Sequence, residues 1–237
     1  MKIQKTYSHK KGEEILKRDK PEIIQEIESA IHNINALDCL TKESLEKSKA
    51  RRWGGLLFSP RVINAYFRNE LLLPGGWLVL NENTKKYGEH TILFTSQNGA
   101  IEDEGRQRKI DGIKDQIGLE IQFGKYAFMG YDVFSKMIIF KKIGRIVYGI
   151  EIVLMQEMSN CMSTGVSAFE HLMIDFKYRG EADIDIPILV IGVASTEEEW
   201  DAVFERQALY KKDPITTRAM YPQIGLSDLK GNHPGPK

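Results

Sequence analysis

Residues 109–123 read KIDGIKDQIGLEIQF, and we predict that the rest of the chain is organised around this stretch. In its second half, apolar side chains alternate with Gly118, Glu120 and Gln122, which is the period of a half-buried strand. Glu120 and Gln122 therefore point to the same face of that strand. Upstream, residues 110–113 predict a second short strand, and the polar residues between the two strands predict a turn.

The two strands are expected to pair as a hairpin. If Ile113 pairs with Gly118, Asp111 lies opposite Glu120, with Cβ atoms about 5 Å apart. Carboxylates so close repel each other, and a bound divalent cation is the simplest way to keep both ionised at neutral pH. Oxygen ligands without a cysteine or histidine nearby favour Mg²⁺ or Mn²⁺ over zinc, and the backbone carbonyl of Ile121 can supply a further oxygen.

A metal ion held by few protein ligands keeps water molecules, and attack of a metal-bound water on phosphorus is the chemistry that such sites commonly serve. The pattern Asp-x8-Glu-x-Gln is weakly specific by itself. It also fits a strand that binds no metal and whose solvent face happens to carry a glutamate and a glutamine.

A longer segment carries a family resemblance. Residues 119–126, LEIQFGKY, resemble the active-site strand of type II restriction endonucleases of the BstYI and BglII type, within the PD-(D/E)XK nuclease superfamily. Gln122 stands where the superfamily usually has lysine, a departure that these relatives share. The likeness continues in the same order at Tyr7-Ser8-His9, Thr41 to Ser44, Ser59-Pro60, Tyr131-Asp132, Met162-Ser163 with Gly165, and Ile191-Gly192.

The resemblance implies a mixed α/β fold with the PD-(D/E)XK core, a central mixed sheet flanked by helices. It implies that Asp111 and Glu120 hold a catalytic Mg²⁺, for which Mn²⁺ can substitute, and that Gln122 takes the third motif position. An amide can orient a water molecule only by hydrogen bonds, so more of the activation has to come from the metal.

The resemblance also assigns DNA contacts to three residues. It places Lys125, Ser163 and Thr164 near base edges in the major groove, where a lysine can donate to guanine O6 and N7. A lysine at a helix start can instead contact phosphate or water, and a short Ser/Thr/Gly loop need not touch a base.

The implied enzyme is a Mg²⁺-dependent type II restriction endonuclease that cuts double-stranded DNA at a short palindrome, with a GATC core suggested by the relatives. A palindrome presents the same face twice, so we expect a homodimer, with the helix that begins at Lys125 at its interface. A cognate DNA methyltransferase is expected to protect the host DNA.

The composition bears on this interpretation. The 237 residues carry 33 basic and 33 acidic side chains, so the formal net charge is zero, whereas a DNA-binding protein is usually basic. Contacts to phosphate are local, because charges are screened beyond about 10 Å at ordinary salt. Basic clusters occur at residues 42–52, 106–109 and 141–145, although each is also compatible with a solvated face.

The cellular setting is predicted from what the sequence contains. Cys39 and Cys161 are far apart and form no cluster with metal-ligand spacing, which favours a reduced, cytoplasmic protein. We recognise no signal peptide and no apolar run of the roughly 18 residues that span a bilayer, so no membrane contact is expected.

Apolar periodicity predicts one domain over residues 1–237, with a core of about 7–212 and an extended tail from about residue 213. Helices are predicted over residues 13–34 with an interruption at Pro21, 60–73, 125–140, 167–178 and from 197 onward. Strands are predicted over residues 77–80, 91–95, 145–155 and 187–194.

Some side chains have predicted roles in these elements. Ser59 and Ser167 are expected to cap the helices that follow them. Apolar residues recur at helical spacing through Phe128, Tyr131, Phe134 and Met137 or Ile138, and we expect the aromatic residues among them to face the core rather than to stack on bases.

Three other functions remain open at this point. A repair or recombination nuclease would share the hairpin but cut by DNA structure, and it would need no neighbouring methyltransferase gene. A DNA-binding protein that has lost cleavage would not need to keep the two acids and the glutamine together. A two-carboxylate hydrolase acting on sugars would show a pocket lined by aromatic residues and would need no metal.

Overall fold

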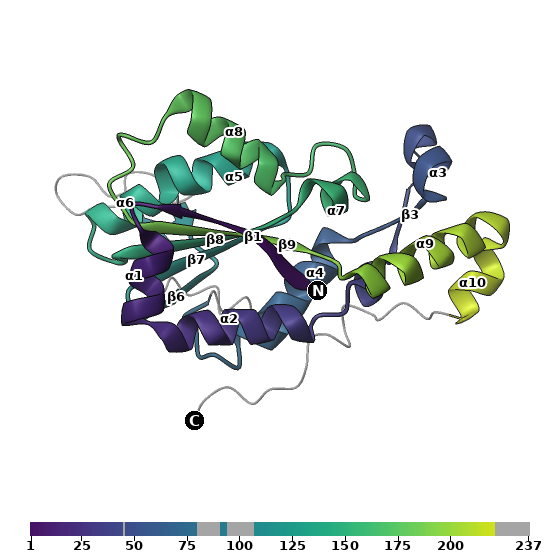
Figure 1. The fold of residues 1–237 in the computed structure, drawn as a ribbon, viewed down its shortest axis with the longest axis horizontal. Coiled ribbons are helices and arrows are strands. Elements are labelled where there is room, and N and C mark those ends of the chain that lie inside the picture. The colour runs from purple at the N-terminus through teal and green to yellow at the C-terminus, as the bar shows by residue number, and fades with distance from the viewer. Residues whose placement is uncertain (45, 80–90, 94–106, 221–237) are drawn as a thin grey trace.

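The computed structural model describes residues 1–44, 46–79, 91–93 and 107–220 of the 237-residue chain. Helices cover both faces of a central sheet, and a smaller helical extension leaves one end of it (Figure 1). The predicted strands over residues 77–80 and 91–95 and the predicted tail fall partly outside the described residues.

The central sheet contains five strands. They span Lys2–His9 (β1), Gly112–Lys114 (β6), Ile117–Gln122 (β7), Tyr148–Leu154 (β8) and Ile188–Ala194 (β9). Their order in the sheet is β1-β9-β8-β7-β6; β7, β8 and β9 are parallel, and the outer strands pair antiparallel with their neighbours. The predicted mixed α/β fold is therefore confirmed.

The inner strands β8 and β9 follow from the sequence, whereas β1 was missed. Strand β9 is a continuous apolar run and β8 is apolar apart from Glu151, as expected for parallel strands that helices cover on both faces, and every residue of β9 is buried. The sequence of β1, KIQKTYSH, is mostly polar and contains two lysines, which is typical of an edge strand. Its conformation depends on pairing with β9, so it has no local signature.

Strand β7 is more buried than predicted. We expected one face to be exposed, but all residues from Ile117 to Ile121 are buried and only Gln122 is partly exposed. Helices pack on both faces of the sheet, and this covers the polar positions of the strand as well as the apolar ones (Figure 1).

The predicted hairpin register is confirmed. Ile113 pairs with Gly118, and Gly112 pairs with Leu119. The turn is shorter than predicted, because only Asp115 and Gln116 lie between the strands, and both have positive φ angles, of 49° and 63°. A two-residue turn of this kind matches the twist of an antiparallel pair and fixes its register.

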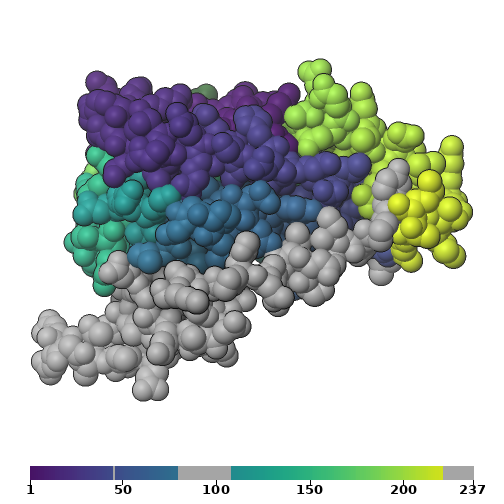
Figure 2. All heavy atoms as spheres, turned by 90° about the horizontal axis from the view of Figure 1, so that it is seen from below, coloured from purple at the N-terminus to yellow at the C-terminus, as the bar shows by residue number. Residues whose placement is uncertain are grey.

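One face of the sheet is covered by the first helices of the chain. These elements are α1 (Gly12–Asp19), α2 (Pro21–Asn33), α4 (Pro60–Phe67) and the π-helical turn η2 (Arg68–Leu72). Pro21 interrupts the first predicted helix as expected, because proline cannot continue a helix but is well suited to start one. Figure 2 shows α1 and α2 over this face, next to α4.

The other face is covered by helices from the second half of the chain. They are α5 (Tyr126–Tyr131), the π-helical turn η3 (Asp132–Lys136), α6 (Met137–Lys142) and α8 (Phe169–Arg179). Our prediction was wrong for Phe128, which is 58% exposed, whereas Phe134 is partly buried against the core and the predicted position Met137 is fully buried, as are Met129 and Val133. The inward face also includes Asp132, which we did not predict to be buried.

The extension at one end of the sheet contains short elements and the last two helices (Figure 1). They are η1 (Ala36–Cys39), β2 (Lys42–Glu43), α3 (Lys47–Trp53), β3 (Leu56–Leu57), α9 (Glu197–Lys212) and α10 (Pro214–Met220). The remaining described elements are β4 (Thr91–Leu93), β5 (Gln107–Lys109) and α7 (Gln156–Asn160).

The helix α10 corrects the predicted extended tail. The Asp213 carboxylate accepts a hydrogen bond from the Thr216 backbone N–H at 3.0 Å, so it caps the helix, and Pro214 takes the first helical position. Both residues are helix-start signals, which the prediction of a tail did not take into account.

The predicted caps also differ from the structure. Ser59 precedes α4 without a side-chain capping bond, and α8 begins at Phe169 rather than after Ser167. The Ser167 hydroxyl instead donates to the Gly124 carbonyl at 3.1 Å. The prediction of one domain over residues 1–237 stays a prediction.

Candidate active site

The hairpin places Asp111 beside Glu120, as the confirmed register requires. Asp111 directly precedes β6, and one Asp111 carboxylate oxygen accepts a hydrogen bond from the Ile121 backbone N–H at 2.9 Å. This bond fixes the aspartate against the strand that carries Glu120. In an antiparallel pair the N–H and C=O of one residue point to the same side, so the Ile121 carbonyl faces the edge at which Asp111 lies.

The two acids differ in exposure. Asp111 is exposed to solvent, whereas Glu120 is 3% exposed. Burial raises the pKa of Glu120 well above its ordinary value, and the nearby Asp111 charge raises it further. Although Asp111 is exposed, many protein atoms surround its carboxyl, and this desolvation raises its pKa in spite of the Ile121 hydrogen bond.

A lysine that sequence reasoning missed lies against Glu120. The Lys136 ammonium in η3 donates to a Glu120 carboxylate oxygen at 2.6 Å and lies 2.6 Å from one oxygen of Asp132. Burial by itself lowers the pKa of Lys136, but attraction to both carboxylates outweighs burial, so the pKa is raised. A sequence signal for this lysine did exist: an Asp and a Lys lie four residues apart on the inner face of an otherwise apolar helix.

Gln122 is held at both ends of its amide. Its NH₂ group donates to the second Asp132 oxygen at 3.3 Å, and its carbonyl oxygen accepts from the Gly124 backbone N–H at 3.1 Å. Asp132 therefore joins Gln122 to Lys136, because each of its oxygens contacts one of them.

Glu151 is a further acid that we did not single out. It lies beside Glu120 on the neighbouring strand β8 and is fully buried. Neither of its carboxylate oxygens has a hydrogen-bond partner among the described residues. Burial raises its pKa well above the ordinary value, with repulsion from Asp132 and Glu120 adding to the effect. The sequence could have singled out Glu151, because it is the one acidic residue in the otherwise apolar segment YGIEIVL.

The donor set suits a hard divalent cation. Asp111, Glu120 and the Ile121 carbonyl offer oxygen atoms on one edge, and Mg²⁺ prefers oxygen ligands. Burial raises the pKa of both acids, and a cation bound between them would favour their ionised forms. In the described part of the chain, no group of three His, Cys, Asp or Glu side chains is arranged to hold a metal ion.

The three predicted DNA-binding residues lie on two adjacent segments. Lys125 forms an isolated bridge with Val166, and the Tyr126 backbone N–H donates to the Gly165 carbonyl at 3.0 Å. These bonds hold the loop that carries Ser163 and Thr164 against the start of α5.

The same loop contacts the basic part of the extension. The Lys42 ammonium donates to the Ser163 hydroxyl, and the Thr164 hydroxyl donates to the Glu46 carboxylate at 2.8 Å. Lys49 of α3 donates to the Asn160 carbonyl at 2.9 Å. The predicted basic cluster of residues 42–52 is thus connected to the predicted base-reading loop.

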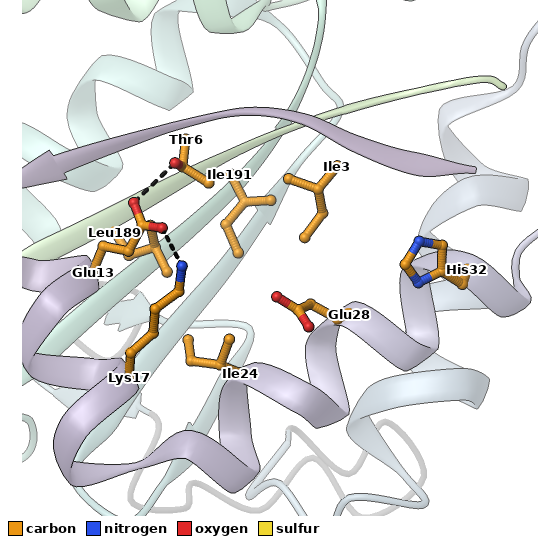
Figure 3. A pocket seen from close by; sticks show the side chains of 9 residues that line it. All are labelled: Ile3, Thr6, Glu13, Lys17, Ile24, Glu28, His32, Leu189 and Ile191. Atoms are coloured by element: carbon orange, nitrogen blue, oxygen red, sulfur yellow. Dashed lines mark hydrogen bonds and ion pairs between the residues drawn. The ribbon is translucent and has the colours of Figure 1, made fainter. Parts of the chain in front are cut away.

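A hollow of about 370 Å³ lies on the opposite face of the sheet (Figure 3). It is lined by Ile3, Thr6, Glu13, Lys17, Ile24, Glu28, His32, Leu189 and Ile191. Glu13 accepts hydrogen bonds from Thr6 at 2.8 Å and from Lys17 at 2.6 Å, which satisfies its carboxylate. None of the predicted site residues contributes to this hollow, so we place the candidate site at the hairpin.

A mixed sheet flanked by helices, with an Asp and a Glu paired at the edge of a hairpin, is the arrangement expected of the restriction endonuclease class. Residues 4–193 match the family described as restriction endonuclease BglII/BglIII. The chain belongs to this family and is a site-specific deoxyribonuclease.

Two solved structures share the fold. The crystal structure of restriction endonuclease BglII complexed with a DNA 16-mer matches with a TM-score of 0.61 and 21% identity, covering 83% of this chain and 78% of that chain. Free BglII matches with a TM-score of 0.54 and 19% identity, covering 83% and 81%. No protein with a curated description matches the sequence. Within the described residues, no helix is long and apolar enough to cross a membrane.

Proposed function

We propose that this protein is a Mg²⁺-dependent type II restriction endonuclease that hydrolyses double-stranded DNA at a short palindromic site with a GATC core. The observation that carries this proposal is the hairpin register, which sets Asp111 opposite Glu120 in a chain of the BglII/BglIII family. The solved BglII complex contains a DNA 16-mer, which supports duplex DNA as the ligand here.

Asp111, Glu120 and the Ile121 carbonyl would hold the metal ion. When bound, the ion supplies an activated water and offsets the charge of the scissile phosphate; Mn²⁺ offers the same oxygen chemistry. Gln122 takes the third motif position, and its amide orients the water or a neighbouring ligand. The bonds from Gly124 and to Asp132 pre-organise that amide, so little freedom is lost when substrate binds.

We assign recognition of the DNA sequence to Lys125, Ser163 and Thr164. The backbone bonds between their two segments keep the three side chains in one region. In this proposal Lys125 donates to guanine O6 and N7 in the major groove, and the short hydroxyl side chains approach neighbouring bases.

The proposed active form is a homodimer. A palindrome has twofold symmetry, so two copies related by the same axis each present one hairpin to one DNA strand. We assign α5 to the interface, and the 58% exposure of Phe128 and 38% exposure of Tyr126 support this assignment. The enzyme acts in the cytoplasm beside a cognate DNA methyltransferase that protects the host genome.

Digestion of a mixed plasmid DNA with and without Mg²⁺, followed by sequencing of the fragment ends, tests the proposal. Discrete fragments with one common end sequence are expected only when the metal is present. Random ends, or the same cutting in excess chelator, would contradict a metal-dependent restriction enzyme. A single palindrome without GATC at the ends would correct the recognition sequence alone.

Replacing Lys125 with alanine is expected to weaken discrimination between the cognate site and sites that differ by one base pair, by about 1–3 kcal/mol. Competition binding with Ca²⁺ in place of Mg²⁺ measures this without cleavage. The matched control is Lys5→Ala, which removes an exposed lysine from the edge strand β1. Unchanged discrimination in Lys125→Ala would remove this residue from the set that reads bases.

A further inference from the structure

The Lys136 ammonium beside Glu120 is buried, and burial is energetically unfavourable for a charged side chain. The Lys136 side chain is 12% exposed, and the side chains of Glu120 and Asp132, which its ammonium contacts, are each 4% exposed. Removing charges from water is costly, and a buried ion pair is often no more stable than a well-packed apolar replacement. The folding of the chain therefore does not by itself explain why a lysine occupies this position.

The backbone directs Lys136 to the site. Asp132 and Lys136 begin and end the π-helical turn η3, which lies between α5 and α6. Around them the same helical face is apolar, with Met129, Val133 and Met137 buried. Widened turns of this kind occur often at functional sites, because they redirect side chains that a regular helix would place elsewhere.

The contacts also fix which atoms the ammonium can reach. Asp132 holds Lys136 at 2.6 Å with one oxygen and Gln122 at 3.3 Å with the other. Lys136 reaches Glu120 at 2.6 Å. Its charge therefore lies between Glu120 and Asp132, and the same Asp132 carboxylate connects it to the amide of Gln122.

Neutralising the nearby carboxylates does not by itself explain why a lysine occupies position 136. Glu120, Asp132 and the fully buried Glu151 lie in one cluster, and Lys136 contacts the first two of them. Both oxygens of Glu151 have no hydrogen-bond partner among the described residues, so the lysine is not placed to satisfy every acid of the cluster. If the role were structural, the same helical face would be expected to carry an apolar side chain here.

We propose that Lys136 is a further catalytic residue, whose ammonium stabilises the negative charge that develops on the water attacking the scissile phosphate beside Glu120. This inference rests on the proposed function. The attacking water forms its bond to phosphorus and loses a proton to solvent, while one P–O ester bond breaks and the leaving oxygen takes a proton from solvent. Lys136 keeps its proton throughout and acts through charge, which the neutral amide of Gln122 cannot supply.

Lys136→Met tests this role, with Lys17→Met as the matched control. Lys17 forms an ion pair of the same length, 2.6 Å, with Glu13 at the same i, i+4 spacing on α1, but on the opposite face of the sheet (Figure 3). At saturating Mg²⁺, Lys136→Met should lower the single-turnover cleavage rate by about 10²- to 10³-fold, while DNA binding in Ca²⁺ stays unchanged. Lys17→Met should change neither.

Metal binding gives a readout that does not depend on cleavage. Removing a positive charge next to the metal ligands should strengthen Mn²⁺ binding by roughly tenfold, measured by calorimetry in the absence of DNA. Tighter Mn²⁺ binding with slower cleavage is the expected combination. A folded Lys136→Met variant that cleaves within about threefold of the wild-type rate overturns the proposal. Absence of cleavage by the wild-type protein would instead overturn the proposed function.

A double variant covers the case in which Lys136→Met does not fold. Gln122→Lys combined with Lys136→Met returns an ammonium to the same Asp132 carboxylate from β7. Recovery of cleavage in the double variant supports a role in charge stabilisation. A double variant that folds and binds DNA but does not cleave overturns the proposal, as does failure of both variants to fold, which would assign Lys136 to folding.

Discussion

Glu120→Ala and Asp111→Asn are each expected to lower DNA cleavage by about 10³-fold or more while leaving site-specific DNA binding largely intact. Each change removes a charged oxygen ligand from the proposed metal site, and the charge stabilisation that the ion brings to the reaction is lost with it. Binding is expected to persist because the proposed function assigns it to other residues, namely Lys125 and the loop that carries Ser163 and Thr164.

Cleavage of a plasmid with one site and a mobility-shift assay in Ca²⁺ measure the two effects separately. Glu13→Ala is the control, because Glu13 is a carboxylate that bonds Thr6 and Lys17 on the opposite face of the sheet. It should cleave at the wild-type rate. Joint loss of binding and folding in both hairpin variants would show that Asp111 and Glu120 serve the structure instead.

Phe123→Ala is expected to lower the free energy of unfolding by about 3–5 kcal/mol. Phe123 directly follows β7 and is fully buried, and its ring packs against Phe67 of α4 with centroids 5.3 Å apart. Alanine would leave a cavity under the strand that carries Glu120 and Gln122, and both lost apolar burial and lost packing contribute to the cost.

Urea unfolding followed by circular dichroism measures this change. Tyr178→Ala removes an aromatic side chain at a position of α8 that is 76% exposed, and it should cost less than about 1 kcal/mol. Equal effects of the two substitutions would mean that Phe123 is not part of the core. In that event the packing between α4 and the end of β7 would need revision.

Local pattern was sufficient to predict the hairpin. The period-two alternation around Glu120 located β7, and the few polar residues before it left room for only a tight turn. A tight turn fixes register, so the sequence alone could place Asp111 opposite Glu120. The apolar segments of β8 and β9 were predicted for a similar reason, since a segment rich in β-branched apolar residues is typical of a buried parallel strand.

Features that depend on contacts with distant elements could not be predicted from the local sequence pattern. The polar strand β1 forms because β9 offers it an edge, and Phe128 faces solvent because the inner face of its helix is set by contacts across the sheet. The helix α10 is a different case, because its start signals at Asp213 and Pro214 were present in the sequence and were not used.

The sequence by itself determined the sheet class, the hairpin and the pairing of Asp111 with Glu120, because these follow from side-chain period and short connections. Tertiary structure alone decided that Asp132, Lys136 and Glu151 join them. Those three residues lie on a helix and on another strand, and no local rule relates their positions to β7. They meet because helix packing on the sheet encloses charges that the sequence leaves far apart, and this enclosure sets the electrostatics of the candidate site.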